Sequence, residues 1–162
     1  MNKIIVIGCP GSGKSTFSKE LHKITGIPLF HLDMMYWNAD KTTVEKQVFL
    51  ERLSNTMKSL KWIIDGNYFS TMEQRLKECD TVFFLDYPLE ICLKGIKERK
   101  GKPRSDIPWI ETEDDEEFIE FIKNYNMQIR PKVKELLCKY SSKNIFIFTS
   151  RTEAKEFLSH LQ

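Results

Sequence analysis

Residues 8–15 read GCPGSGKS and match the pattern GxxxxGK[S/T] at every fixed position. An apolar run at residues 4–7 precedes the pattern, and apolar residues recur every three or four positions after it. This order predicts a buried strand, a glycine-rich loop and a helix over residues 14–25, the setting in which the pattern binds phosphate groups. A chance glycine turn is the alternative, and the register of strand, loop and helix argues against it.

The residue types in this loop fit a nucleoside triphosphate. Gly11 and Gly13 let the backbone curl until its N–H groups converge on phosphate oxygens, and the helix that starts at Lys14 adds the positive end of its dipole. We expect Lys14 to reach the β and γ phosphates and the Ser15 hydroxyl to bind magnesium. ATP is favoured over GTP, because the sequence has no NKxD segment. The residues expected to bind the nucleotide are Gly8, Pro10, Gly11, Ser12, Gly13, Lys14, Ser15 and Thr16.

Strand-like and helix-like segments alternate along the rest of the chain. A helix over residues 44–60 is expected, another follows Pro88, and a third begins after Thr112 and should be broken or kinked by Pro131. The alternation predicts an α/β fold with five parallel strands and helices on both faces of the sheet. A length of 162 residues suits one domain, residues 1–162. The further strands are expected at residues 27–33, 62–65, 81–87 and 144–150.

Three aspartates, Asp33, Asp65 and Asp86, stand at or near the carboxyl ends of predicted strands, the edge at which open α/β sheets bind ligands. A magnesium-bound triphosphate needs a carboxylate for the ion or its waters, and an acceptor hydroxyl is helped by a carboxylate that receives its proton. We favour these functions for Asp33 and Asp65. For Asp86, just before Pro88, we favour a turn or a helix cap.

A basic stretch follows the helix expected after Pro88. Mobile arginines that close over a transferred phosphoryl group stabilise its charge, so residues 99–115 are expected to form a lid that carries Arg99 and Arg104. A solvated basic helix end is the alternative, and we favour it for most of the lysines. Arg130 is a third candidate further along the chain.

The aromatic residues Tyr36 and Trp37 follow Asp33 and either stack on a ring of the acceptor or belong to the core. His31 is interpreted as structural, although it stands near enough to reach the site.

The four cysteines lack CxxC spacing and indicate reduced thiols, as in a cytoplasmic protein. The sequence contains no membrane span or signal peptide, and a formal net charge of +2 does not indicate a nucleic-acid surface.

With these residues in place, the chain resembles the adenylate-kinase-like branch of P-loop kinases, and within it the bacterial topology modulation (FlaR-related) proteins. The resemblance spans nearly the whole chain. It rests on the loop GCPGSGKST and on four further segments, HLDMMYW at residues 31–37, WIIDGNY at 62–68, FFLDYP at 83–88 and NYNMQIRPKV at 124–133.

The resemblance implies a three-layer P-loop fold with the strand order 2-3-1-4-5, ATP as donor, magnesium, and a cytoplasmic location. Asp65 resembles the aspartate that organises the magnesium shell together with Ser15. Asp33 resembles a strand-end aspartate near the acceptor hydroxyl, Arg99 a lid-entry arginine and Arg104 a lid arginine.

These observations predict a kinase that transfers the γ-phosphoryl group of MgATP to a small acceptor, which is a nucleotide, a nucleoside or a similar metabolite. Lys14, Asp33, Arg99, Arg104 and Arg130 are the candidates for catalysis, and Ser15 and Asp65 are the candidates for the metal. The alternative is an ATP-binding regulatory protein with little or no turnover. Neither a membrane nor a nucleic acid is expected as a partner, and the sequence does not predict the oligomeric state.

Overall fold

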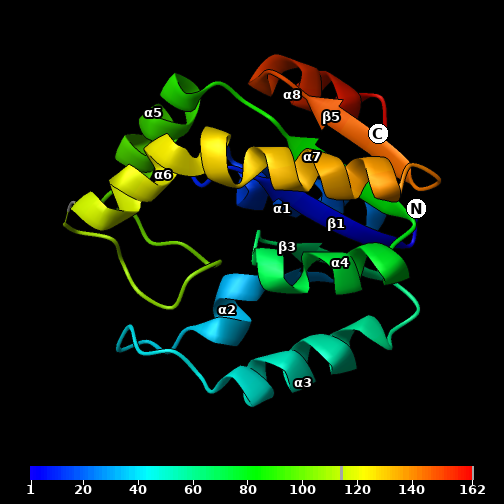
Figure 1. The fold of residues 1–162 in the computed structure, drawn as a ribbon, viewed down its shortest axis with the longest axis horizontal. Coiled ribbons are helices and arrows are strands. Elements are labelled where there is room, and N and C mark those ends of the chain that lie inside the picture. Colours follow the sequence, from blue (N-terminus) through cyan, green and yellow to red (C-terminus); the bar gives the residue numbers. More distant parts are fainter. Residues whose placement is uncertain (114, 162) are drawn as a thin grey trace.

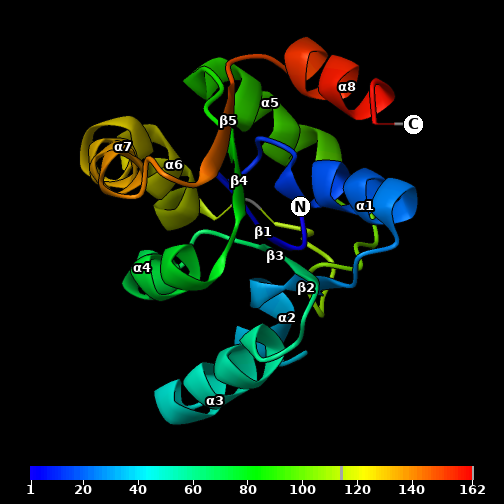
Figure 2. The same cartoon turned by 90° about the vertical axis from the view of Figure 1, so that its right-hand side faces the viewer.

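The computed structural model describes residues 1–113 and 115–161. A parallel sheet in the order β2-β3-β1-β4-β5 forms the middle layer, which confirms the predicted α/β fold and strand order. Figure 2 shows α1 and α8 on one side of this sheet and α4 and α7 on the other. The strands are β1 (Lys3–Gly8), β2 (Leu29–His31), β3 (Trp62–Asp65), β4 (Thr81–Leu85) and β5 (Asn144–Phe148).

The helices follow the strands along the chain, as Figure 1 shows. None of the helices in the described parts of the chain is both long enough and apolar enough to cross a bilayer. The helices are α1 (Lys14–Thr25), α2 (Leu32–Tyr36), α3 (Lys46–Met57), α4 (Phe69–Glu78), α5 (Leu89–Arg99), α6 (Glu116–Gln128), α7 (Arg130–Lys139) and α8 (Arg151–Ser159).

The burial of each strand follows its place in the sheet. Every residue of β3 and β4 is buried, and so is every residue of β1 except Lys3, because helices cover both faces of these central strands. The edge strands β2 and β5 are mostly part-buried or exposed. Alternate residues of each strand point to opposite faces of the sheet and belong to two cores. Ile4 and Phe83 pack with α1 and α8 on one face, and Ile5 and Phe84 pack with α3, α4 and α7 on the other.

The structure corrects the expected bounds of two segments. The second strand is three residues long, and Asp33 lies in the first turn of α2 rather than at a strand end. An acidic side chain is favoured there by the helix dipole. The helix expected over residues 44–60 is shorter, because α3 ends at Met57 and Leu60, at the end of the expected range, is 88% exposed.

The acidic segment before α6 also starts later than expected. Asp115 caps α6 by accepting a hydrogen bond from the Phe118 backbone N–H, so the helix begins at Glu116 rather than directly after Thr112. Asp114, within the expected lid and helix start, lies outside the described residues. The predicted break near Pro131 is confirmed, because α6 ends at Gln128 and Pro131 lies in the first turn of α7.

Candidate active site

The phosphate loop connects the central strand β1 to α1 at the carboxyl edge of the sheet. Gly11 and Gly13 adopt φ values of 82° and 95°, a region that favours glycine. Gly13 is the N-cap of α1 and has no side chain to occupy the first N–H groups of the helix. The loop therefore presents backbone donors and the positive end of a helix dipole, as anion binding requires.

Lys14 folds back over this loop. Its Nζ donates hydrogen bonds to the carbonyl oxygens of Gly8, at 3.0 Å, and Cys9, at 3.2 Å. Burial lowers the pKa of Lys14, and the charges of Asp65 and Asp33 oppose that shift. The predicted phosphate-binding lysine therefore lies close to both predicted aspartates.

Helix α5 packs directly against the loop through two glycines. A Cβ atom added at Gly95 would lie 2.0 Å from the carbonyl oxygen of Gly11, and one added at Gly11 would lie 2.0 Å from the carbonyl oxygen of Cys92. Only glycine at both positions lets the two backbones approach so closely. This contact fixes the loop against the helix that leads to Arg99.

The turn after β3 connects the phosphate loop to Asp33. Asn67 accepts a hydrogen bond from the Gly8 N–H at 3.1 Å, and Tyr68 adopts a left-handed conformation with φ 36°. The fully buried guanidinium of Arg75 donates to the carbonyl oxygens of Gly66 at 2.9 Å, of Tyr68 at 3.3 Å, and of Asn67. Arg75 therefore holds an unusual backbone conformation in place.

Asp33 and Tyr68 form a hydrogen-bonded pair beside Lys14. The Tyr68 hydroxyl donates to a carboxylate oxygen of Asp33 at 2.7 Å. Burial raises the pKa of Asp33, while the hydrogen bond from Tyr68 and the charge of Lys14 oppose the shift. Burial also raises the pKa of Tyr68, so its hydroxyl stays protonated and remains a donor. Asp33 is therefore a stronger base than an exposed aspartate, which suits a proton acceptor.

Asp65 is buried at the end of β3 with its two oxygens in different settings. The Nδ1–H of His31 donates to Oδ1 at 2.8 Å, since a carboxylate can only accept. Oδ2 has no hydrogen-bond partner among the described residues, although Asp65 is only 4% exposed. His31, interpreted from the sequence as structural, thus orients a candidate metal ligand.

These residues fit a magnesium ion. No group of three or more His, Cys, Asp or Glu side chains in the described chain is placed to hold a metal ion on its own. Magnesium in phosphoryl-transfer sites commonly takes one or two carboxylates and completes its shell with phosphate oxygens and water. The unpartnered oxygen of Asp65 and the hydroxyl of Ser15 supply ligands of this kind.

Arg99, at the end of α5, and Arg104, in the connection between α5 and α6, were both predicted. They pair with two acids of the connection, Asp106 and Glu111, that were not predicted. Arg99 forms an ion pair with Glu111 at 2.8 Å, and Arg104 contacts Glu111 at 2.7 Å. The Nε of Arg104 donates to Asp106 at 3.0 Å, and the Ser15 hydroxyl donates to Asp106 at 2.6 Å. The connection is thus joined to the phosphate loop.

Asp106 is buried in this network. Burial alone would raise the pKa of its carboxyl, but hydrogen bonds from Arg104 and Ser15 outweigh that effect and lower the pKa. Asp106 is therefore ionised at neutral pH. The only local signal for it was its place two residues after Arg104.

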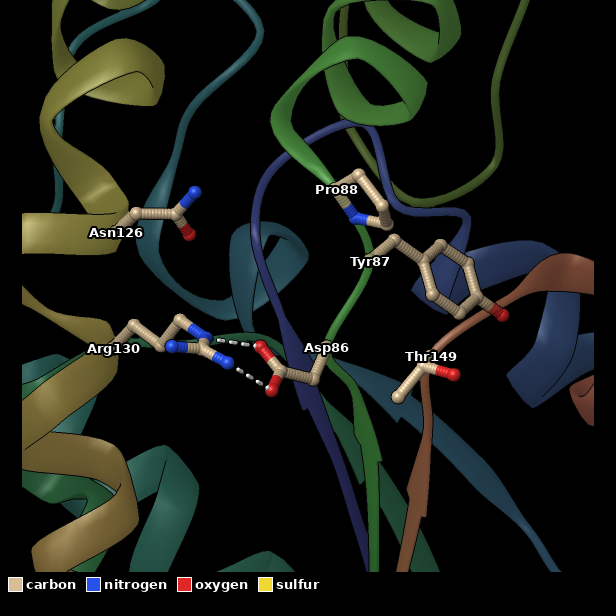
Figure 3. Close-up of a pocket in the computed structure, with 6 residues that line it drawn as sticks. All are labelled: Asp86, Tyr87, Pro88, Asn126, Arg130 and Thr149. Atoms are coloured by element: carbon tan, nitrogen blue, oxygen red, sulfur yellow. Dashed lines mark hydrogen bonds and ion pairs between the residues drawn. The ribbon is translucent and has the colours of Figure 1, made fainter.

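Arg130 lies at the break between α6 and α7. Its guanidinium donates two hydrogen bonds to Asp86, at 2.6 and 2.8 Å (Figure 3). Lys134 adds an ion pair to Asp86 at 3.3 Å. Asp86 therefore forms ion pairs with Arg130 and Lys134, whereas the sequence favoured a role for Asp86 in a turn or a helix cap. The pair borders a cavity of about 330 Å³, which is lined by Asp86, Tyr87, Pro88, Asn126, Arg130 and Thr149.

Tyr36 and Trp37, the aromatic residues after Asp33, pack against different rings. Tyr36 packs edge-on against Tyr68, with ring centroids 5.1 Å apart, and against Phe49 at 5.3 Å. Trp37 meets Trp109 of the α5–α6 connection at 5.5 Å. Tyr36 is part of a half-buried aromatic cluster, and Trp37 joins the end of α2 to the connection between α5 and α6.

Comparison with known proteins identifies distant relatives. No protein-family model matches the chain. A shikimate kinase of Clostridium botulinum (strain Kyoto / Type A2) is 26% identical over 167 residues, which cover 96% of this chain and 98% of the relative. A second shikimate kinase, from Clostridium botulinum (strain Loch Maree / Type A3), is 27% identical over 150 residues, which cover 85% of this chain and 88% of the relative.

Solved structures show the same architecture. A shikimate kinase from Acinetobacter baumannii in complex with shikimate aligns with a TM-score of 0.67 at 16% identity and covers 99% of this chain and 90% of its own. A shikimate kinase from Bacteroides thetaiotaomicron aligns with a TM-score of 0.59 at 19% identity and covers 98% of this chain and 95% of its own. The chain therefore has the P-loop kinase fold of the shikimate kinases, and its curated relatives support the predicted ATP-dependent phosphotransferase.

Proposed function

We propose that the chain is a kinase that transfers the γ-phosphoryl group of MgATP to a hydroxyl group of a small acceptor. The observation that carries this proposal is the position of Asp33. Its carboxylate has a raised pKa, receives a hydrogen bond from Tyr68 and lies close enough to Lys14 for the two charges to interact. A base beside a phosphate-binding lysine is the arrangement that phosphoryl transfer to a hydroxyl requires.

The nucleotide would bind along the loop from Gly8 to Thr16. The loop N–H groups would hold its phosphate oxygens, and Lys14 would neutralise charge on the β and γ phosphates. Ser15 and Asp65 would hold magnesium, Ser15 by its hydroxyl and Asp65 by its unpartnered oxygen. When bound, the ion neutralises charge on the phosphates and helps to align them.

Asp33 would orient the acceptor hydroxyl and receive its proton. The acceptor oxygen forms a bond to the γ-phosphorus, the bond from that phosphorus to the bridging oxygen of ADP breaks, and the proton passes to Asp33. Tyr68 keeps one oxygen of Asp33 occupied, so that the other one is left for the acceptor. Catalysis would come from positioning and electrostatics rather than from a covalent intermediate.

The α5–α6 connection would act as the lid, over residues 99–115. Arg99 and Arg104 are paired with acids here and would turn to the transferred phosphoryl group when it binds. Arg130 is the third proposed arginine, and its ion pair with Asp86 would have to open before it could reach a phosphoryl group.

The acceptor candidates come from two sources. The sequence favoured nucleotides, nucleosides or similar metabolites, and the relatives add shikimate, the compound bound in the Acinetobacter baumannii structure. The aromatic rings of Trp37 and Trp109 beside the site favour an acceptor that contains a ring.

We also propose a cytoplasmic location, because Cys9, Cys79, Cys92 and Cys138 are free thiols, as a reducing compartment would keep them.

The test is ADP production from MgATP with shikimate, nucleosides, nucleoside monophosphates and other small hydroxylated metabolites. We expect one acceptor class to stimulate ADP release, and we expect Lys14→Ala and Asp33→Asn to remove the stimulation. Tight ATP binding with no stimulation by any acceptor would contradict the proposal and support the ATP-binding regulatory protein.

A further inference from the structure

Asp106 occupies a position in which an acid is unexpected. The Ser15 hydroxyl is the group through which a P-loop binds magnesium. Here it donates a 2.6 Å hydrogen bond to Asp106, which is 91 residues away in the sequence and 3% exposed. The lid of a kinase is expected to bring positive charge to the phosphates, yet this connection brings a buried carboxylate to the magnesium-binding hydroxyl.

The geometry suits two ligands of one ion. Magnesium binds oxygen at about 2.1 Å in an octahedron, so two neighbouring ligand oxygens lie roughly 3 Å apart. The oxygens of Ser15 and Asp106 are 2.6 Å apart. A shift of a few tenths of an ångström would let both bind the same ion.

A second observation points to a cation at this place. The Oδ2 atom of Asp65 has no hydrogen-bond partner in the described chain, although Asp65 is only 4% exposed. Asp65 and Asp106 both lie close enough to Asp33 for their charges to act on it. The Nζ of Lys14 donates its hydrogen bonds to the carbonyl oxygens of Gly8 and Cys9, and Arg104 pairs with Asp106, so Oδ2 of Asp65 is left as an acceptor for a cation.

We propose that Asp106 is a carboxylate ligand of the magnesium ion of bound MgATP, directly or through one water, so that the lid closes on the metal as well as on the phosphates. This inference rests on the proposed function, because it requires MgATP at the phosphate loop. Arg104, which now holds Asp106, would be released to the phosphate oxygens as the ion takes over the charge of the carboxylate.

The test compares ATP binding with and without magnesium, by calorimetry on the full chain. Asp106→Asn keeps the shape of the side chain and removes its charge. We expect the magnesium concentration that half-maximally tightens ATP binding to rise about tenfold in this variant, while metal-free ATP affinity changes less than about twofold. Asp106→Glu, which restores the charge, should recover part of the magnesium dependence.

The matched control is Glu111→Gln. Glu111 also pairs with Arg104, but it does not share the hydrogen bond to Ser15, so its loss should leave the magnesium dependence unchanged. An unchanged magnesium dependence in Asp106→Asn would overturn the inference alone. Tighter MgATP binding in that variant would also overturn it, because Asp106 would then compete with the ion for Ser15. Failure of the wild-type chain to bind ATP would overturn the proposed function as well.

Discussion

The hydroxyl of Tyr68 donates a 2.7 Å hydrogen bond to Asp33 and so joins the turn after β3 to the first turn of α2. The same turn accepts the N–H of Gly8 through Asn67. The candidate base and the phosphate loop are therefore positioned by one short segment, which Arg75 holds from behind.

Replacing Tyr68 by Phe should change the pH dependence of the kinase. The hydrogen bond from Tyr68 lowers the pKa of Asp33, so its loss raises that pKa. Because Asp33 must be ionised to receive a proton, the acid limb of the kcat profile should move to higher pH. We expect kcat at neutral pH to fall about tenfold with little change in the KM for ATP. Tyr36→Phe, which alters the neighbouring ring, is the control, and an equal shift in both variants would argue against a specific role.

Replacing Asp33 by Asn should stabilise the protein while it removes the activity. The raised pKa means that the folded state binds a proton at Asp33 more tightly than the unfolded state does. Ionisation of Asp33 therefore destabilises the fold at neutral pH. We expect a higher Tm for Asp33→Asn at pH 7.5, with a difference that shrinks as the pH falls through the raised pKa of Asp33 and is gone below about 4, the ordinary aspartate range. A Tm gain that does not depend on pH would contradict the role of burial.

Replacing Gly95 by Ala should disturb the phosphate loop. Within a helix this change ordinarily stabilises by about 1 kcal/mol. Here the added Cβ would lie 2.0 Å from the carbonyl oxygen of Gly11, so either α5 or the loop has to move. We expect a lower Tm and a loss of at least about tenfold in ATP affinity. Lys97→Ala, at an exposed position of the same helix, should show neither effect.

Replacing Arg75 by Met should destabilise the fold strongly. The change removes the donor for the carbonyl oxygens of Gly66, Asn67 and Tyr68 in a buried setting. Leaving them unpaired should cost about 3 kcal/mol or more, measured by urea unfolding. Arg52→Met is the control, because Arg52 donates to a single carbonyl oxygen, that of Met35, at the exposed surface. Similar losses in the two variants would show that the turn does not depend on Arg75.

The phosphate loop and the three central strands could be predicted from the sequence because their signals are local. A glycine pattern and unbroken apolar runs specify such elements within a few residues, and β1, β3 and β4 formed close to the expected bounds. The sheet order came from the resemblance to P-loop kinases. Helices α2 and α4 were missed, because α2 is five residues long and the segment before β4 was not interpreted.

The partners of the charged residues could not be predicted, because they are distant in the sequence. Ser15 and Asp106 are 91 residues apart, and Asp86 and Arg130 are 44 apart. Arg75 has the pattern of an ordinary helix residue, and only the fold shows that it is fully buried behind the turn. Aspartates at the ligand-binding edge of the sheet were predicted, but an acid supplied by the connection between α5 and α6 was not.

The most direct test of the central claim is to follow the γ-phosphoryl group by phosphorus NMR, with MgATP and the acceptor that stimulates ADP release. Transfer predicts one new phosphate ester for each ADP formed in the wild-type chain, and neither product with Asp33→Asn. ADP accompanied by an equal amount of inorganic phosphate, with no ester, would contradict transfer to an acceptor and identify the chain as a hydrolase.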